Sequence, residues 1–175
     1  SQIEAMSWMT AGGFQTVMSA FVGQNYGARK WDRVYKGYFV GMGIMTIIGL
    51  LATVLLILAA KPLFSVFIPD EETIRYGAVY LQILGVSQLF MCIELATTGA
   101  FNGLGKTVPP AIVGIAFNAL RIPGALILSS TSLGLNGVWW AISISSVFKG
   151  IVLASWYLLM LRKNVKSREI NMVQA

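Results

Sequence analysis

The chain has 175 residues, of which 56% are hydrophobic and only 11% are charged, and its mean hydropathy is +0.71. A soluble domain carries about 25% charged residues, so this chain has too few charges to cover an ordinary core, and lipid is the expected surrounding of its apolar surface. Histidine is absent, which excludes histidine-based acid–base chemistry, and the net charge of +6 does not predict nucleic-acid binding because the basic residues gather near 29–36 and 162–168.

Apolar windows of about 20 residues, the length that crosses a bilayer core, occur five times along the chain. In chain order they are 3–24, 38–60, 77–103, 108–129 and 136–161, and the connections at 25–33, 61–72, 103–110 and 129–137 carry helix breakers. The windows are too long for strands and lack period-two alternation. The sequence therefore predicts an all-α, polytopic membrane helix bundle of about five transmembrane helices across 1–161, with a cytoplasmic basic tail at 162–175. The pairs Gly37/Gly41 and Gly99/Gly103 have the spacing of close helix contacts.

Most basic residues lie on one side of the predicted bundle, in the connections that alternate along the chain and in the C-terminal tail. One side holds Arg29, Lys30, Arg33, Lys36, Lys106, Arg162, Lys163, Lys166 and Arg168. The other side holds only Lys61 and Arg75, close to three acidic residues at 70–72. By the positive-inside rule the first side is cytoplasmic, so the N-terminus is expected outside and the C-terminus inside a cell (inner or plasma) membrane. Since the chain starts without Met close to an apolar window, we expect a fragment of a longer membrane protein.

The segment AFNGLGKT at 100–107 is close to a phosphate-loop pattern. A phosphate loop needs a buried strand before it and an acidic partner for Mg²⁺ after it. Here an apolar run of more than 20 residues precedes the pattern, and the only acidic residue after Glu94 is Glu169, in the polar tail. We interpret this segment as the cytoplasmic end of a helix. No other catalytic constellation is found, so the sequence predicts that the protein is not an enzyme.

Three charged residues fall within the predicted spans: Glu94, Arg121 and Lys149. A charge at the centre of a membrane helix costs roughly 2.5–3.5 kcal/mol, and all three are expected in the middle third of the bilayer core. Asn118 shares a helix face with Arg121. Two interpretations stay open: a buried ion pair of Glu94 with Lys149 or Arg121, or a proton- or cation-coupled site that lines a cavity. The surplus positive charge would be balanced by an acid in an absent segment or by an anionic ligand.

A polar stripe surrounds Glu94 on the third predicted helix. Ser87, Met91, Glu94, Thr98 and Asn102 are spaced by four, three, four and four residues, and Tyr80 extends the stripe. Intramembrane acids usually mark transport paths, so we predict a cation- or substrate-binding site here. Its candidate residues are Glu94, Met91, Ser87, Thr98, Asn102, Lys149, Arg121 and Asn118, with no metal ligand set and no cofactor.

The segment FVGQNYGARKWDRV at 21–34 resembles the loop after the second helix of a half in the multidrug and toxic compound extrusion (MATE) family. Further matches occur in family order at 3–9 (IEAMSWM), 98–107 (TGAFNGLGKT), 120–123 (LRIP) and 134–143 (GLNGVWWAIS). The resemblance covers nearly the whole chain. It implies that the chain supplies roughly helices eight to twelve of a twelve-helix antiporter, and thus most of one of two six-helix lobes around a central cavity.

The resemblance also implies a function. Family members exchange Na⁺ or H⁺ for organic, often cationic, drug-like compounds, so the expected partners are membrane lipid, such small molecules and the missing N-terminal lobe of the same protein. Some subfamilies use an acid in the tenth helix. The resemblance implies that Glu94 would lie in that helix, offset by about one turn from that acid, where this chain has Met91. Two alternatives stay open: a lipid-linked oligosaccharide flippase of related architecture and a non-transporting membrane scaffold subunit.

Overall fold

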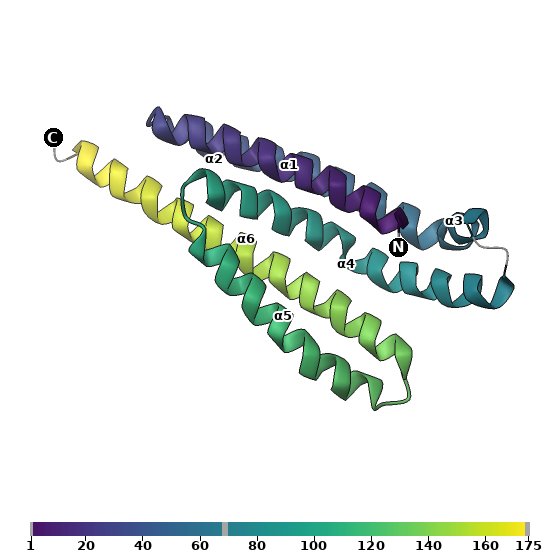
Figure 1. Ribbon diagram of the computed structural model, residues 1–175. Helices are drawn as coiled ribbons and strands as arrows, with labels where there is room; N and C mark the ends of the chain where they lie inside the picture. Colours follow the sequence, from purple (N-terminus) through teal and green to yellow (C-terminus); the bar gives the residue numbers. More distant parts are fainter. Residues whose placement is uncertain (1, 68–69, 174–175) are drawn as a thin grey trace.

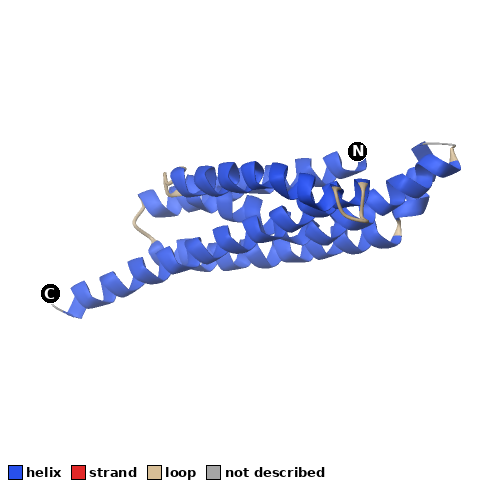
Figure 2. Cartoon of the chain, turned by 90° about the horizontal axis from the view of Figure 1, so that it is seen from below, coloured by secondary structure: helices blue, strands red, loops and turns tan. Residues whose placement is uncertain are grey.

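The computed structural model describes residues 2–67 and 70–173, and every regular element in these two ranges is an α-helix (Figures 1 and 2). The helices are α1 (Gln2–Gly27), α2 (Trp31–Leu58), α3 (Ala60–Phe67), α4 (Glu71–Gly103), α5 (Val108–Ser129) and α6 (Leu135–Val173). The five long helices run lengthwise along the molecule, and the C-terminal end of α6 projects beyond the others (Figure 2). The predicted all-α bundle is confirmed.

Among the described residues, four helical segments are long and apolar enough to cross a membrane: Trp31–Leu58, Glu71–Gly103, Val108–Ser129 and Leu135–Asn164. They contain the predicted spans 77–103, 108–129 and 136–161 and all but the last two residues of 38–60. The remaining predicted span, 3–24, lies in α1, whose 26 residues reach about 39 Å at 1.5 Å per residue. Polar residues such as Gln15 and Thr16 lower its hydropathy below that of the four, so its crossing of the membrane stays a prediction.

The helices extend beyond the predicted boundaries. The connection predicted at 61–72 contains α3 from its second residue onward and the first two residues of α4, and α6 continues into the predicted tail as far as Val173. An apolar window detects the part of a helix that suits the bilayer core. It does not detect polar ends rich in Lys, Arg and Glu, which form helices readily in water.

Both ends of α4 have identifiable signals. At its start, the Asp70 carboxylate accepts a hydrogen bond of 2.9 Å from the Thr73 backbone N–H and another from the Thr73 hydroxyl, and these bonds hold the pKa of Asp70 below its usual value. At its other end, Gly105 takes a positive φ of 70° and redirects the chain into α5. A helix, not a strand, therefore precedes the GLGKT segment, which excludes a phosphate loop there.

Helix α4 is central in the bundle: it packs against α1, α2 and α6, whereas α5 packs mainly on α6 (Figure 1). Glycines permit these close approaches. A Cβ atom at Gly103 would lie 2.5 Å from the Ser19 carbonyl oxygen of α1, and one at Gly99 would clash with the Gln15 carbonyl oxygen. The predicted Gly99/Gly103 pair is therefore a contact surface between α1 and α4.

A buried aromatic cluster joins α2, α4 and α6 near the ends that the charge pattern assigns to the cytoplasm. The rings of Tyr38 and Tyr157 have centroids 4.4 Å apart, and Phe101 meets Tyr157 edge to face at 4.9 Å. The hydroxyls of Tyr38 and Thr97 are 3.1 Å apart. Because Thr97 already donates to the Ile93 carbonyl, Tyr38 is the donor in that bond. This cluster fixes the rotation of α4 relative to its two neighbours.

Candidate functional site

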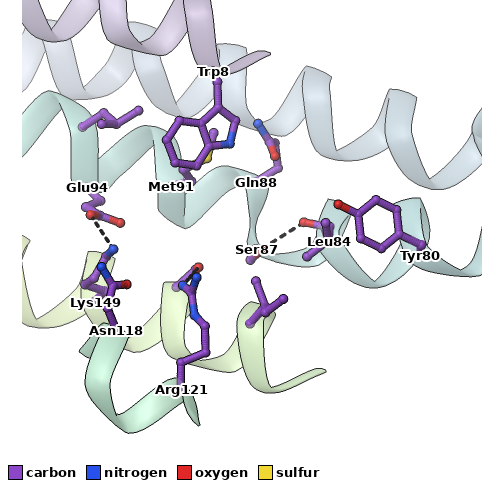
Figure 3. Close-up of a pocket in the computed structure, with 13 residues that line it drawn as sticks. Trp8, Tyr80, Leu84, Ser87, Gln88, Met91, Glu94, Asn118, Arg121 and Lys149 are labelled. Atoms are coloured by element: carbon purple, nitrogen blue, oxygen red, sulfur yellow. Dashed lines mark hydrogen bonds and ion pairs between the residues drawn. The ribbon is translucent and has the colours of Figure 1, made fainter. Parts of the chain in front are cut away.

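A cavity of about 290 Å³ lies between α1, α4, α5 and α6, partway along the predicted spans (Figure 3). Its lining residues are Trp8, Tyr80, Leu84, Ser87, Gln88, Met91, Glu94, Leu95, Asn118, Arg121, Ile142, Ser146 and Lys149. Six of the eight predicted site residues belong to this set: Ser87, Met91, Glu94, Asn118, Arg121 and Lys149. The structure thus brings together side chains from three different predicted spans.

The face of α4 that lines the cavity differs from the predicted polar stripe in two ways: it includes residues beside the stripe, and it ends before the last two residues of the stripe. Gln88 and Leu95, on the neighbouring stripe, also line the cavity. Their spacing of three and four residues from Met91 was visible in the sequence, but it did not show how wide the cavity face is. Thr98 and Asn102 do not line the cavity. They continue the stripe one and two turns toward the C-terminal end of α4, beyond the cavity.

Glu94 and Lys149 form an ion pair across the α4–α6 interface. The distance between Glu94 Oε1 and Lys149 Nζ is 3.0 Å, and the two side chains are 16% and 13% exposed (Figure 3). A Cβ atom at Gly150 would lie 2.6 Å from the Phe90 carbonyl oxygen, so the two helices touch beside the pair. Of the two partners that the sequence left open for Glu94, the structure selects Lys149.

Arg121 reaches from α5 to serine hydroxyls on α6. Its Nε donates to Ser145 Oγ over 2.9 Å, and its Nη2 donates to Ser146 Oγ over 3.3 Å. Ser145 in turn donates to the Ile142 carbonyl, so its hydroxyl is oriented to accept from Arg121. Among the side chains that the structure describes, no carboxylate forms an ion pair with Arg121. In Figure 3 the guanidinium lies between Lys149 and Ser87.

Trp8 adds a wall from α1 and was not predicted as a site residue. Figure 3 shows its indole projecting from α1 over the cavity, beside Met91 and Gln88. Trp8 is 54% exposed, so it bounds the cavity without sealing it. Its position depends on how α1 lies against α4, which a single sequence does not reveal.

The cavity combines ionisable groups with small polar groups. It holds one carboxylate, one ammonium and one guanidinium, and Ser87 donates its hydroxyl hydrogen to the Leu84 carbonyl over 2.9 Å. No group of three or more potential His, Cys, Asp or Glu metal ligands occurs within the described part of the chain. The arrangement suits reversible binding of an ion, a proton or a charged organic molecule.

A family model and individual relatives of known sequence place this chain in the same family. A model of the MatE family matches residues 1–127. "Probable multidrug resistance protein NorM" of Thermotoga maritima is 25% identical over 162 residues, which are 89% of this chain and 34% of that protein. "Multidrug and toxin extrusion protein 1" of Homo sapiens is 27% identical over 152 residues, which are 86% of this chain and 27% of that protein.

A solved structure has a similar fold. It is described as the inward-facing conformation of a multidrug resistance MATE family transporter of the MOP superfamily, and it superposes with a TM-score of 0.83 at 22% sequence identity. The match covers 94% of this chain and 39% of that one. The chain therefore spans about a third of the length of the relatives it matches.

Proposed function

This chain belongs to the MatE family of multidrug efflux transporters, and from that premise we propose that it is the C-terminal portion, roughly helices eight to twelve, of a cation-coupled exporter of organic compounds. The family is one of transporters, not enzymes. The share of its relatives that the chain covers supports a missing N-terminal lobe. That lobe would face the cavity and complete the path for the exported compound.

The observation that carries this proposal is the largely buried Glu94–Lys149 pair in a cavity partway along the predicted membrane spans. An acid in that position costs free energy on insertion, so a role in transport accounts for its presence better than packing alone. Helix register alone can be fixed without charge, as the glycine contacts between α1 and α4 illustrate.

Coupling of ion movement to export would arise because the ion and Lys149 compete for the Glu94 carboxylate. In the described state Lys149 holds the carboxylate. Binding of H⁺ or Na⁺ to Glu94 would weaken its attraction to Lys149 and loosen the contact between α4 and α6. Rocking of the two lobes between inward- and outward-open states would then depend on whether the ion or the exported compound is bound. Either ion fits this scheme, and no further cofactor is needed.

We propose that the N-terminus of this chain lies outside the cell membrane and the C-terminus in the cytoplasm. The α1–α2 turn holds Arg29 and Lys30, the α4–α5 turn holds Lys106, and both lie toward the same end of the bundle as the C-terminal end of α6 (Figure 1). The α5–α6 turn at the opposite end carries no charged residue. This asymmetry supports the orientation.

The two alternative functions differ in their support. A non-transporting scaffold would have no use for a cavity lined by ionisable groups, and no feature of the cavity favours it. A flippase of lipid-linked oligosaccharides has one observation in its favour, because Arg121 lacks a carboxylate partner among the described side chains and could meet a diphosphate. The small size of the cavity, about 290 Å³, favours the exporter.

The exporter proposal is tested by Glu94→Gln in the complete protein, produced in a host that lacks its own drug exporters. We expect drug resistance to be lost while the protein still accumulates in the membrane, because glutamine keeps the shape but not the charge. Glu71→Gln is the matched control: it makes the same change on the same helix at an exposed position far from the cavity. Unchanged resistance with Glu94→Gln would reduce Glu94 to a structural role.

A further inference from the structure

An apolar groove of about 400 Å³ lies between α1 and α2. Four apolar side chains of α1 line one wall, among them Met18 and Phe21, and six residues of α2 line the other. The groove shares no lining residue with the cavity between α1, α4, α5 and α6 that holds Glu94. It is therefore a separate feature of the protein.

The groove forms because α1 and α2 meet through side chains that lie on glycines. A Cβ atom at Gly37 would clash with the Phe21 ring, and one at Gly41 would clash with the methyl group of Met18. At the α1–α4 interface, by contrast, the glycines meet backbone atoms. The ring and the thioether keep the backbones of α1 and α2 further apart, so a furrow stays open beside them.

The α2 wall of the groove changes from basic to apolar along the helix. Its lining residues are spaced by one, three or four positions and form one helix face: Arg33, Lys36, Gly37, Val40, Gly41 and Ile44. From Arg33 to Ile44 this face extends about 16 Å at 1.5 Å per residue. One leaflet contributes about 15 Å, half of the bilayer core. The groove thus has a basic end and the length of one leaflet.

Arg33 and Lys36 have no counter-charge in the groove. Both side chains are exposed, and no carboxylate forms an ion pair with either of them in the part of the chain that the structure describes. Asp32 is the only acidic residue between positions 5 and 69, and it does not line the groove. It offsets one of four basic charges, since Arg29 and Lys30 lie in the adjoining turn.

We propose that the groove binds one anionic phospholipid of the cytoplasmic leaflet, with the phosphate at Arg33 and Lys36 and one acyl chain along the apolar face toward Ile44. Anionic lipids of that leaflet attract basic residues near the membrane surface, and long basic side chains reach from a helix toward the headgroups. The chain would cover Val17 and Val40, which are 62% and 63% exposed. The choice of leaflet follows from the orientation proposed above, but the binding depends neither on it nor on the exporter function.

A phospholipid fits the groove better than a helix of the missing N-terminal lobe does. A helix is about 10 Å wide with its side chains, and one that crosses the bilayer would need a contact along its whole length, whereas this groove has the length of one leaflet. A helix packed against Arg33 and Lys36 would also have to supply carboxylates for them. A lipid phosphate meets both cations at the membrane surface.

The test compares two lipids with the same acyl chains, the anionic palmitoyl-oleoyl phosphatidylglycerol and the zwitterionic palmitoyl-oleoyl phosphatidylcholine. Native mass spectrometry of the complete transporter in detergent micelles counts the lipids that stay bound as each is titrated. We expect the wild type to retain one phosphatidylglycerol at concentrations at which phosphatidylcholine stays unbound. Arg33→Gln/Lys36→Gln should weaken binding of phosphatidylglycerol by about 30-fold, the combined effect of two basic residues near an anionic headgroup.

The matched control for charge is Arg29→Gln/Lys30→Gln. It removes the same charge from the same end of the bundle at two exposed positions that do not line the groove. Binding of phosphatidylglycerol should stay close to that of the wild type. An equal loss in both double variants would overturn the proposal, because general attraction to the basic end of the bundle would then account for the binding.

Two tryptophan variants test the place of the acyl chain without a change of charge. Val40→Trp fills the groove and should weaken phosphatidylglycerol binding by about tenfold or more, because fewer methylene groups can be buried there. Ile47→Trp lies on the same helix outside the groove, where Ile47 is 61% exposed, and should bind as the wild type does. This pair also gives the measurement if Arg33→Gln/Lys36→Gln fails to accumulate in membranes.

Two further outcomes would overturn the proposal. If the wild type retains both lipids equally or retains neither, the groove does not select an anionic phospholipid. If both tryptophan variants lose binding, or neither does, the acyl chain does not lie in the groove. Each of these outcomes leaves the exporter function standing, since export of a dye from proteoliposomes measures that function separately.

Discussion

Glu94 on α4 and Lys149 on α6 are joined by an ion pair of 3.0 Å inside a cavity that α1, α4, α5 and α6 enclose. The pair is notable because both charged side chains are largely buried. Two charged side chains that are each less than one-fifth exposed are retained between helices that also meet where Gly150 approaches Phe90 and where the Ser143 hydroxyl donates to the Ile83 carbonyl.

Removing one partner of the pair should destabilise the protein more than removing both charges. Lys149→Met removes the ion-pair partner of the largely buried Glu94 carboxylate, and we expect a loss of about 3 kcal/mol in the free energy of unfolding. The double variant Glu94→Gln/Lys149→Met should lose less than Lys149→Met alone. Unfolding of the complete protein in detergent, followed by circular dichroism, measures both. Additive losses would mean that the pair does not couple the two helices.

The contact between α1 and α4 should be sensitive to a single methyl group. Gly99→Ala would push a Cβ atom into the Gln15 carbonyl oxygen, and we expect a loss of about 1–3 kcal/mol from overpacking. Gly114→Ala on α5 is the control, since nothing lies within 4 Å of the added atom and alanine favours a helix by about 0.5–1 kcal/mol over glycine. Equal effects of the two variants on thermal stability would contradict the close approach of α1.

Two tyrosines of the aromatic cluster should respond differently to loss of their hydroxyls. Tyr38→Phe removes the donor to Thr97 and should cost about 1 kcal/mol. The hydroxyl of Tyr157 is buried and has no hydrogen-bond partner among the described residues, so Tyr157→Phe should be neutral or stabilising. Thermal melting of the two variants side by side checks this order, and a reversed order would rule out the hydrogen-bond assignment.

The proposed orientation predicts which turns face the outside of the cell. Ser132→Cys in the α5–α6 turn should react with a membrane-impermeant maleimide added to intact cells, whereas Lys106→Cys should react only after the cells are permeabilised. Both positions are exposed, and the native Cys92 is buried, so it should give little background. Labelling in the opposite order would invert the topology.

The helical membrane fold was predictable from the sequence because a helix that crosses lipid must be apolar over its whole length in the bilayer core. A window of about 20 apolar residues at 38–60 or 108–129 has few other physical explanations, and charge on alternate connections agrees with the hydropathy. The weaker case is α1, whose polar residues lower its hydropathy although it is a helix of full length. Helix ends such as 162–173 were missed because hydropathy does not report on helices in water.

The candidate site was predictable only in part. Spacing placed Ser87, Met91 and Glu94 on one helix face, which is a local property of α4. The choice of Lys149 over Arg121 as the partner of Glu94 depends on how α4, α5 and α6 are rotated against one another. That rotation is set by contacts distant in sequence, such as Gly150 against Phe90. The same reason explains why Trp8 was missed.

The central claim is that Glu94 takes part in export and does not merely hold Lys149. The most direct test is the charge-swapped variant Glu94→Lys/Lys149→Glu in the complete protein, compared with Glu94→Lys alone. Dye export from proteoliposomes is measured per folded transporter, with thermal stability measured in parallel. We predict that the swap restores most of the stability lost in Glu94→Lys but leaves export near background, because the carboxylate has moved to α6. Recovery of both stability and export to near the wild-type level would contradict the claim and make the pair a structural contact.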